Sequence, residues 1–225
     1  MAVLLVSASM NAVLVYRGLE SKNMVADACV SEYAHLKRDL PQPFAIEGHE
    51  NTTPDEEWRL PDPDTGTVAL TDKYAVSKGL RKAQRWPWDF NKGIYFIQGY
   101  HNLHCLYMVR NSILEYRNNT PQTEHLLHID HCLTSLRDDI LCNADDTPRF
   151  TGGHFKQAGS GTNQYRMCRD WSKLDMWANA RSGCYKTPVD PFDGVSTLER
   201  YKFCPGGGKP WIGAEIFKGV DPPDY

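Results

Sequence analysis

The feature that most limits how this chain can fold is a five-residue pattern, His-x-x-His-Cys, that occurs twice. The first copy spans residues 101–105 (HNLHC) and the second spans residues 128–132 (HIDHC). Each copy stands in a segment with helical periodicity, 101–117 and 121–142. Between the segments, residues 118–121 (NNTP) are typical of a turn in which Pro starts the next helix. The sequence therefore predicts a helical hairpin that carries both motifs.

The two predicted helices repeat one distribution of side chains, with an apolar stripe on one face and the histidines on another. Histidines at positions i and i+3 have Cβ atoms about 5–6 Å apart, so each helix offers two imidazoles to one ion. A turn near Asn119 places His131 opposite Tyr107, about 4.5 Å along the axis from His104. The two histidines of one helix then lie close to the two histidines of the other. The predicted metal ligands are His101, His104, His128 and His131.

Four neutral imidazoles can hold one ion or two adjacent ions, and they suit copper, zinc, iron and nickel alike. A zinc hydrolase is disfavoured because the H-E-x-x-H motif, with its glutamate base, is absent from the sequence. Asp130 and Asp138 lie near the motif histidines and are candidates to accept a ligand's second N–H. The alternative for both is an ordinary solvated charge on a helix.

The seven cysteines contain no C-x-x-C pair, which disfavours a zinc ribbon and a thioredoxin-type motif. Cys105 and Cys132 each follow a histidine by one residue, about 100° around the helix, and so turn toward the apolar stripe. We therefore expect these two cysteines to be structural and in disulfides, with a thiolate metal ligand as the alternative. Cys142 and Cys168 receive the same structural or disulfide assignment. An odd number of cysteines leaves one unpaired, which favours a homodimer or heterodimer.

Two sequons, at Asn51 and Asn118, predict N-glycosylation and fit a secretory lumen, where disulfides persist. The first sixteen residues are apolar but shorter than the roughly 20 that span a membrane. We interpret residues 1–19 as a truncated membrane anchor and residues 20–225 as a single lumenal domain. An amphipathic helix that packs on the domain is the alternative. A net charge of -3 gives no electrostatic reason to expect a nucleic-acid partner.

Elsewhere the patterns are weaker. Residues 20–40 favour a helix, residues 68–69 and 93–98 favour short strands, and a further helix is predicted around Leu174 and Trp177. The chain reads as irregular from Pro188 on. The predicted fold class is therefore mainly α, a helical hairpin with short β-strands and long, irregular, disulfide-stapled loops.

The paired motifs resemble the fungal UstYa-like family. The resemblance covers about two thirds of the chain and is carried by residues 101–106 (HNLHCL), 128–133 (HIDHCL), 136–137 (LR), 142–145 (CNAD) and 168–171 (CRDW), with Leu174, Trp177 and, weakly, Trp58. By resemblance, the chain is expected to have an N-terminal anchor and a lumenal domain, and His101, His104, His128 and His131 are expected to bind copper. Arg166 departs from the family pattern, which often has a histidine two residues before the cysteine of the third motif.

The resemblance implies a copper-dependent oxidase that uses O2 on a fungal secondary metabolite or a ribosomal-peptide precursor. The expected reactions are oxidative cyclisation, hydroxylation, desaturation or halogenation, with one or two copper ions and a small-molecule or peptide substrate. The alternative is a non-catalytic partner protein whose hairpin is stapled by metal or disulfides. An open coordination position distinguishes the two, because a structural site is closed by protein ligands.

Overall fold

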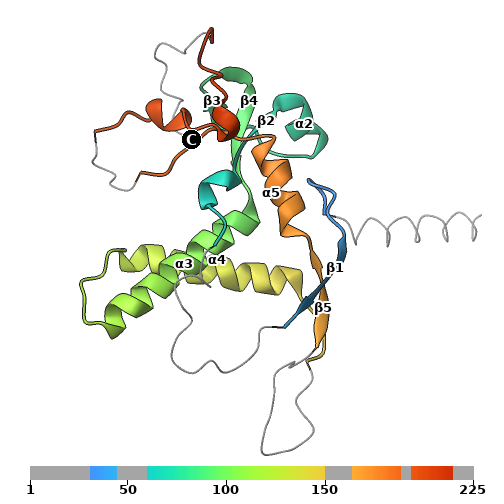
Figure 1. Cartoon of the computed structure of the whole chain (residues 1–225), viewed down its shortest axis with the longest axis vertical. Coiled ribbons are helices and arrows are strands. Elements are labelled where there is room, and N and C mark those ends of the chain that lie inside the picture. Colours follow the sequence, from blue (N-terminus) through green and yellow to red (C-terminus); the bar gives the residue numbers. More distant parts are fainter. Residues whose placement is uncertain (1–30, 45–59, 150–163, 189–193, 215–225) are drawn as a thin grey trace, which may run out of the picture. The chain divides into compact units, whose positions relative to one another are not determined.

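The computed structural model describes residues 31–44, 60–149, 164–188 and 194–214 (Figure 1). The predicted membrane anchor at residues 1–19, the sequon at Asn51 and Trp58 lie outside the described residues. No helix within the described ranges has the length and apolar character to cross a membrane.

The chain divides into two compact units. The first comprises Met1–Glu47 with Arg149–Leu174, and the second comprises Gly48–Pro148 with Asp175–Tyr225. The single domain over residues 20–225 stays a prediction. All four motif histidines belong to the second unit.

The described part of the first unit is built on a two-stranded antiparallel sheet of β1 (Arg38–Pro43) and β5 (Tyr165–Arg169). The helix predicted for residues 20–40 is wrong over its described part, because residues 32–34 form a turn and β1 begins at Arg38. The strands that pair are more than a hundred residues apart in sequence. Local periodicity carried no sign of this pairing.

The second unit contains a three-stranded antiparallel sheet in the order β2 (Thr67–Thr71), β4 (Asp89–Phe96) and β3 (Arg85–Trp86). The strands predicted at residues 68–69 and 93–98 correspond to β2 and β4. The short helix α2 (Asp72–Ser77) follows β2, and the hydroxyl of its N-cap Thr71 accepts a hydrogen bond from the Tyr74 backbone.

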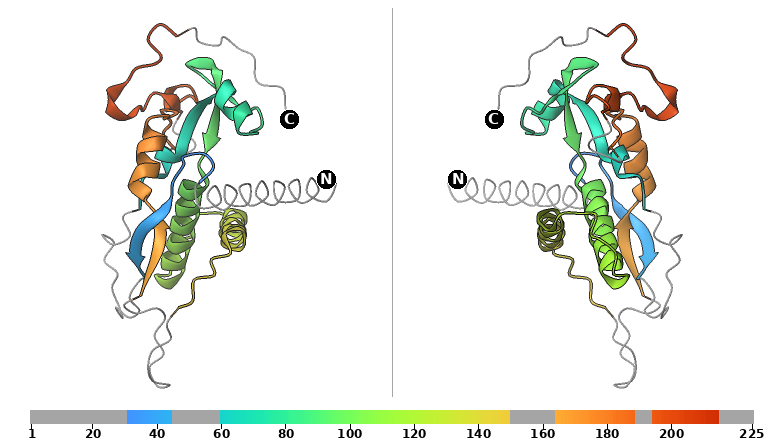
Figure 2. Two further views of the ribbon diagram at one scale, coloured as in Figure 1. Left: turned by 90° about the vertical axis from the view of Figure 1, so that its right-hand side faces the viewer. Right: turned by 90° about the vertical axis from the view of Figure 1, so that its left-hand side faces the viewer.

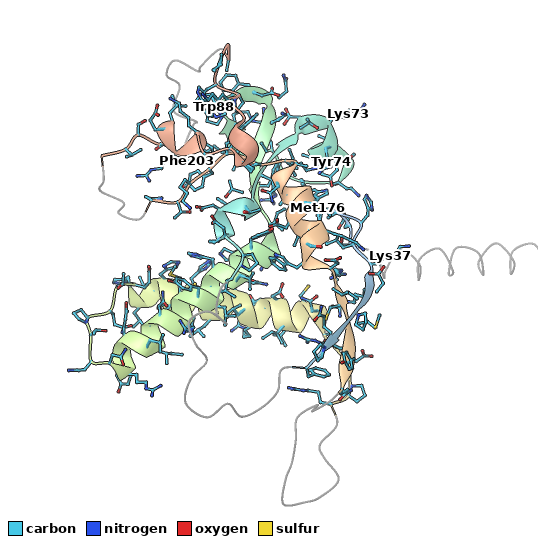
Figure 3. All side chains as sticks on the ribbon, in the orientation of Figure 1. Lys37, Lys73, Tyr74, Trp88, Met176 and Phe203 are labelled. Carbon is cyan, nitrogen blue, oxygen red and sulfur yellow. A yellow bond between two sulfur atoms is a disulfide. The ribbon has the colours of Figure 1, made fainter. Side chains whose placement is uncertain are left out.

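The core of the second unit lies between this sheet and the C-terminal part of the chain. The indole of Trp86 donates to the Gly183 carbonyl at 2.8 Å, and that of Trp88, which is labelled in Figure 3, donates to the Tyr201 carbonyl at 2.7 Å. Both Trp side chains are thus buried with their N–H groups satisfied. A disulfide between Cys184 and Cys204 closes a loop that this core packs against. In a chain-entropy model, closing a loop of this length stabilises the fold by about 3 kcal/mol.

Helices α3 (Gln98–Arg117) and α4 (Leu126–Asn143) carry the two motifs. They contact each other, but α4 crosses α3 and does not run alongside it (Figures 1 and 2). As a result, much of the predicted apolar stripe is exposed, including Ile113, Tyr116, Leu126, Leu133 and Ile140.

The prediction of a mainly α fold built on a helical hairpin is therefore wrong. Helix accounts for 42% and strand for 19% of the structure, with two small antiparallel sheets. The unit is a mixed α and β arrangement, in which the sheet and the C-terminal core provide the buried apolar contacts that the hairpin was expected to supply.

The C-terminal part is more ordered than the sequence indicated. Helix α5 (Trp171–Asn179) contains Leu174 and Trp177, as predicted. Two short 3-10 helices, Glu199–Tyr201 and Pro205–Gly207, follow in the segment that was expected to be irregular.

Candidate metal centre

The first two turns of α3 are fixed to the sheet by the residues immediately before them. Strand β4 ends at Phe96, and the Ile97 backbone donates to the Gly66 carbonyl at 2.9 Å before α3 begins at Gln98. Tyr100 packs against Gly66 so closely that a Cβ there would lie 2.4 Å from the Tyr100 Cβ. This contact anchors the turn that carries His101 and His104.

The four motif histidines form a connected series of neighbouring rings. The ring centroids of His104 and His128 are 5.7 Å apart, and those of His101 and His131 are 5.5 Å apart. The two histidines on α3, His101 and His104, are 6.4 Å apart. The closest pairs therefore join one helix to the other, whereas the sequence had predicted clamps within each helix. We call these the His104/His128 pair and the His101/His131 pair.

Both pairs have a separation that suits a shared ion. An imidazole nitrogen binds a metal at about 2.0–2.1 Å, so two rings on one ion have centres about 5 to 6 Å apart. Within the described ranges, no group of three or more His, Cys, Asp or Glu side chains is gathered so that it could hold one ion. The arrangement therefore offers two two-histidine positions and no single four-histidine point.

Two polar side chains that the sequence interpretation missed contact these histidines. Glu124 Oε2 lies 2.6 Å from His128 Nδ1, and Ser135 Oγ lies 3.3 Å from His101 Nδ1. The spacing of four residues between Glu124 and His128 is the helical signal that could have identified the first contact.

The two aspartates predicted to support the ligands make no such hydrogen bond in the described part of the chain. Asp130 is exposed, and neither it nor Asp138 hydrogen-bonds a histidine in the described part of the chain. Asp138 instead accepts two hydrogen bonds from its neighbour Arg137.

The environment of His101 and His104 keeps both rings neutral. Burial lowers the pKa of His101 below its usual value, and the nearby His131 and His128 lower it further. Burial also lowers the pKa of His104, together with His128 and His101, against a smaller opposing effect of Glu124 and Asp64. A neutral imidazole has the free lone pair that metal binding requires.

Cys105 and Cys132 lie beneath the histidines as free thiols, each with no exposed surface. Burial raises the pKa of Cys105 to about 12, and its hydrogen bond with Cys132 adds to the shift. The expected disulfides at Cys105, Cys132, Cys142 and Cys168 are not formed in this structure. A disulfide joins Cys184 and Cys204 instead, and no local sequence pattern indicated this pairing.

This arrangement predicts a clear order of cysteine reactivity. In the native, metal-free chain, an alkylating reagent at pH 7.5 is expected to modify the exposed Cys142 rapidly and to leave Cys105 and Cys132 unmodified, because the reagent cannot reach a buried thiol. Peptide mass spectrometry after a short pulse measures this, with the unfolded chain as the control in which all free thiols react. Rapid native labelling of Cys105 would contradict the buried placement.

A cavity of about 240 Å³ opens beside the histidines of α3. Its wall combines His101, His104 and the Tyr100 ring from α3 with the Tyr185 ring from the C-terminal part of the chain and with the exposed Phe96 at the end of β4. We call it the apolar cavity. Its full lining is Pro63, Asp64, Gly66, Thr67, Phe96, Ile97, Tyr100, His101, His104, Tyr185 and Thr187.

The acidic group in this wall is paired with a lysine. The Asp64 carboxylate is 3.2 Å from Lys186 Nζ and accepts hydrogen bonds from the backbone and hydroxyl of Thr187. Lys186 Nζ also lies 3.5 Å from Asp62, so two carboxylates share one ammonium group. The hydrogen bond with Asp64 raises the pKa of Lys186.

A second, more open hollow of about 410 Å³ lies at His131. Its lining is polar, with Gln98, Thr134, Ser135, Asp138 and Asp139. The two histidine pairs thus differ in their surroundings, since His131 faces a polar, open region and His104 faces the apolar cavity.

Two other residues singled out in the sequence are placed by the structure. Arg166 lies in β5 of the first unit, with its guanidinium 5.2 Å from the centre of the Phe44 ring. Asn118, in the second sequon, is exposed at the C-cap of α3, where a glycan has room. Glycosylation itself stays a prediction.

Taken together, a mixed α and β unit with paired histidines on two crossing helices beside an apolar cavity defines a candidate metal-dependent enzyme. A sequence model of the family described as "Mycotoxin biosynthesis protein UstYa" matches residues 5–181, and the chain belongs to this family. The matched region includes all four histidines.

Several relatives carry enzymatic names. The chain is 36% identical over 191 residues to Chlorinase cctP2 of Talaromyces islandicus. The aligned region covers 80% of this chain and 61% of that protein. It is 34% identical over 124 residues to Hydroxylase cctR of the same organism, over 53% of this chain and 46% of that protein. UstYa family oxidase phomYc of Diaporthe leptostromiformis is 36% identical over 176 residues, and the aligned region covers 69% of this chain and 66% of that protein. The matches thus span about three fifths of cctP2 and less than half of cctR. No solved structure matches this chain.

Proposed function

We propose that this chain is a copper-dependent oxidoreductase that modifies a secondary metabolite or peptide, with His101, His104, His128 and His131 as the copper ligands. The observation that carries the proposal is the pairing of imidazoles across α3 and α4 at 5.5 and 5.7 Å. The relatives that are named oxidase, hydroxylase and chlorinase support oxidative chemistry.

The residues present fit copper. Imidazole nitrogen is a preferred ligand for copper, and the burial that lowers the pKa of His101 and His104 keeps these rings available to bind it. When bound, copper supplies the one-electron and O2 chemistry that protein side chains lack. We place one ion at each cross-helix pair, because the rings are close in pairs and not gathered at one point.

In this proposal, part of the substrate binds in the apolar cavity. Its volume of about 240 Å³ is below the usual 300–1,000 Å³ of small-molecule sites, so it takes one group of a larger molecule. The aromatic walls exclude water from that group, and Tyr100, held by its hydroxyl bond to Asp175 at 2.8 Å, keeps the wall rigid. The histidines at the cavity edge then face the bond that reacts.

The test is the copper content of the purified full chain after loading and desalting. The wild type is expected to retain copper, and the His104→Ala/His131→Ala double variant is expected to lose it, because the double variant removes one ligand from each pair. Circular dichroism of both chains checks that the variant folds. Unchanged copper content in a folded variant, or no binding by the wild type, would overturn the proposal.

A non-catalytic partner protein is the second candidate, and the exposed apolar residues on α3 and α4 favour it. Azide distinguishes the two functions, because it binds copper only where a coordination position is open. A change in the visible spectrum of the copper-loaded chain on adding azide is expected for the enzyme. No change is expected for a closed, structural site.

A further inference from the structure

The two cross-helix histidine pairs differ in what their ring nitrogens contact. In the His104/His128 pair, a carboxylate reaches a ring, with Glu124 Oε2 2.6 Å from His128 Nδ1. In the His101/His131 pair, the contact is a hydroxyl, with Ser135 Oγ 3.3 Å from His101 Nδ1. A carboxylate that accepts from Nδ1–H fixes the tautomer, leaves Nε2 free for a metal and makes the ring a stronger donor. A hydroxyl at the longer distance does this less well.

The residues before and after Glu124 are both held in place by hydrogen bonds. Before it, the Glu115 carboxylate accepts hydrogen bonds from the backbone of Thr123 at 3.0 Å and from its hydroxyl at 2.6 Å. After it, His125 caps α4, and its Nδ1 accepts from the Leu127 backbone at 3.2 Å. Glu124 therefore stands on a short segment that is held to the end of one helix and the start of the next.

The Glu124 side chain is also partly enclosed, since only 29% of it is exposed. An ordinary exposed pair at positions i and i+4 would lack both this burial and the hydrogen bonds that hold the chain on either side of Glu124.

We propose that Glu124 is a positioning residue for the His104/His128 pair and makes that pair the tighter of two unequal copper positions. This inference rests on the proposed function, since it assumes that the histidines bind copper. It adds that the two ions bind with different affinities. Each pair has one histidine in the wall of the apolar cavity, His104 for the tighter position and His101 for the weaker one.

The chain contains a matched control for this role. Asp130 lies two residues after His128 on the same helix, is exposed and makes no hydrogen bond to a histidine within the described residues. Glu124→Gln and Asp130→Asn each remove one negative charge within a few residues of His128 in the sequence. A long-range effect of charge is common to both variants, whereas loss of the hydrogen-bonded carboxylate is specific to Glu124→Gln.

The experiment is a calorimetric titration of the metal-free full chain with Cu(II), with the EPR spectrum of the first equivalent as a second readout. For the wild type we expect two equivalents with distinct affinities. Glu124→Gln is expected to weaken the tighter equivalent 10- to 100-fold, the usual effect of removing a residue that supports a ligand, and to alter its EPR spectrum. Asp130→Asn is expected to change neither equivalent by more than about twofold. The melting temperature of the metal-free variants checks that both fold.

The outcomes separate the two proposals. If the wild type binds no copper, the proposed function fails and this inference with it. If the wild type binds copper but Glu124→Gln and Asp130→Asn have equal effects, only the positioning role of Glu124 fails. Equal weakening of both equivalents by Glu124→Gln likewise overturns the assignment of Glu124 to one pair.

Discussion

Replacing His101 and His131 together is expected to leave about one copper ion per chain, and replacing His104 and His128 together is expected to do the same. Each double variant removes one complete cross-helix pair and leaves the other, whose ring centroids are 5.7 or 5.5 Å apart. By contrast, His101→Ala/His104→Ala removes one ligand from each pair and is expected to bind almost none. Copper per chain after loading and desalting is the measurement.

This series distinguishes the cross-helix arrangement from its rivals. If each helix instead formed its own clamp, His101→Ala/His104→Ala would keep one ion, held by His128 and His131, and the cross-helix double variants would bind none. If one ion were bound by all four rings, every double variant would lose binding. A folded His101→Ala/His131→Ala chain with no copper would therefore contradict the pairing seen in the structure.

Gly66→Ala is expected to destabilise the chain by about 1–3 kcal/mol, a large part of the stability of a domain of this size. The added Cβ would lie 2.4 Å from the Tyr100 Cβ and 2.7 Å from its Cγ. Tyr100 cannot move aside easily, because only 1% of it is exposed and its hydroxyl donates to Asp175. The contact joins the segment before β2 to the first turn of α3, so relief requires the two elements to separate. The free energy of unfolding in urea measures the loss.

Gly208→Ala is the matched control for this prediction. A Cβ at Gly208 would meet only the Cys204 Cβ, at an ordinary 3.8 Å. The backbone there has φ -55°, which alanine adopts readily. We expect a change near zero, or a small gain from the lower entropy of the unfolded chain. Equal losses in the two variants would show that the close approach of Tyr100 to Gly66 does not limit stability.

The sequence predicted the elements around the site better than their arrangement. The strands at residues 68–69 and 93–98 and the helical character of both motif segments follow from local pattern, and these are found as β2, β4, α3 and α4. The start of α4 does not follow from the local pattern. Thr120 and Pro121 resemble a helix start, but the Thr120 hydroxyl donates to the Glu115 carbonyl, and α4 begins only at Leu126.

That difference in the loop explains the error in the histidine pairing. With α4 starting at residue 121 and the turn near Asn119, His131 was expected opposite Tyr107, whereas the structure places it beside His101. The cap that forms is His125, whose Nδ1 accepts from the Leu127 backbone. The loop before it is held by hydrogen bonds of Glu115 to Thr123, which join residues that local periodicity does not connect.

The apolar cavity draws its walls from two parts of the chain. The histidine wall lies within residues 5–181, which match the family, whereas Tyr185 and Thr187 lie beyond that match, in a segment anchored by the Cys184–Cys204 disulfide and by Asp64. Under the proposed function, substitutions at Tyr185 would reshape the space for a substrate without replacing any of the four proposed copper ligands. The preference for a substrate could then be altered separately from the oxidative chemistry.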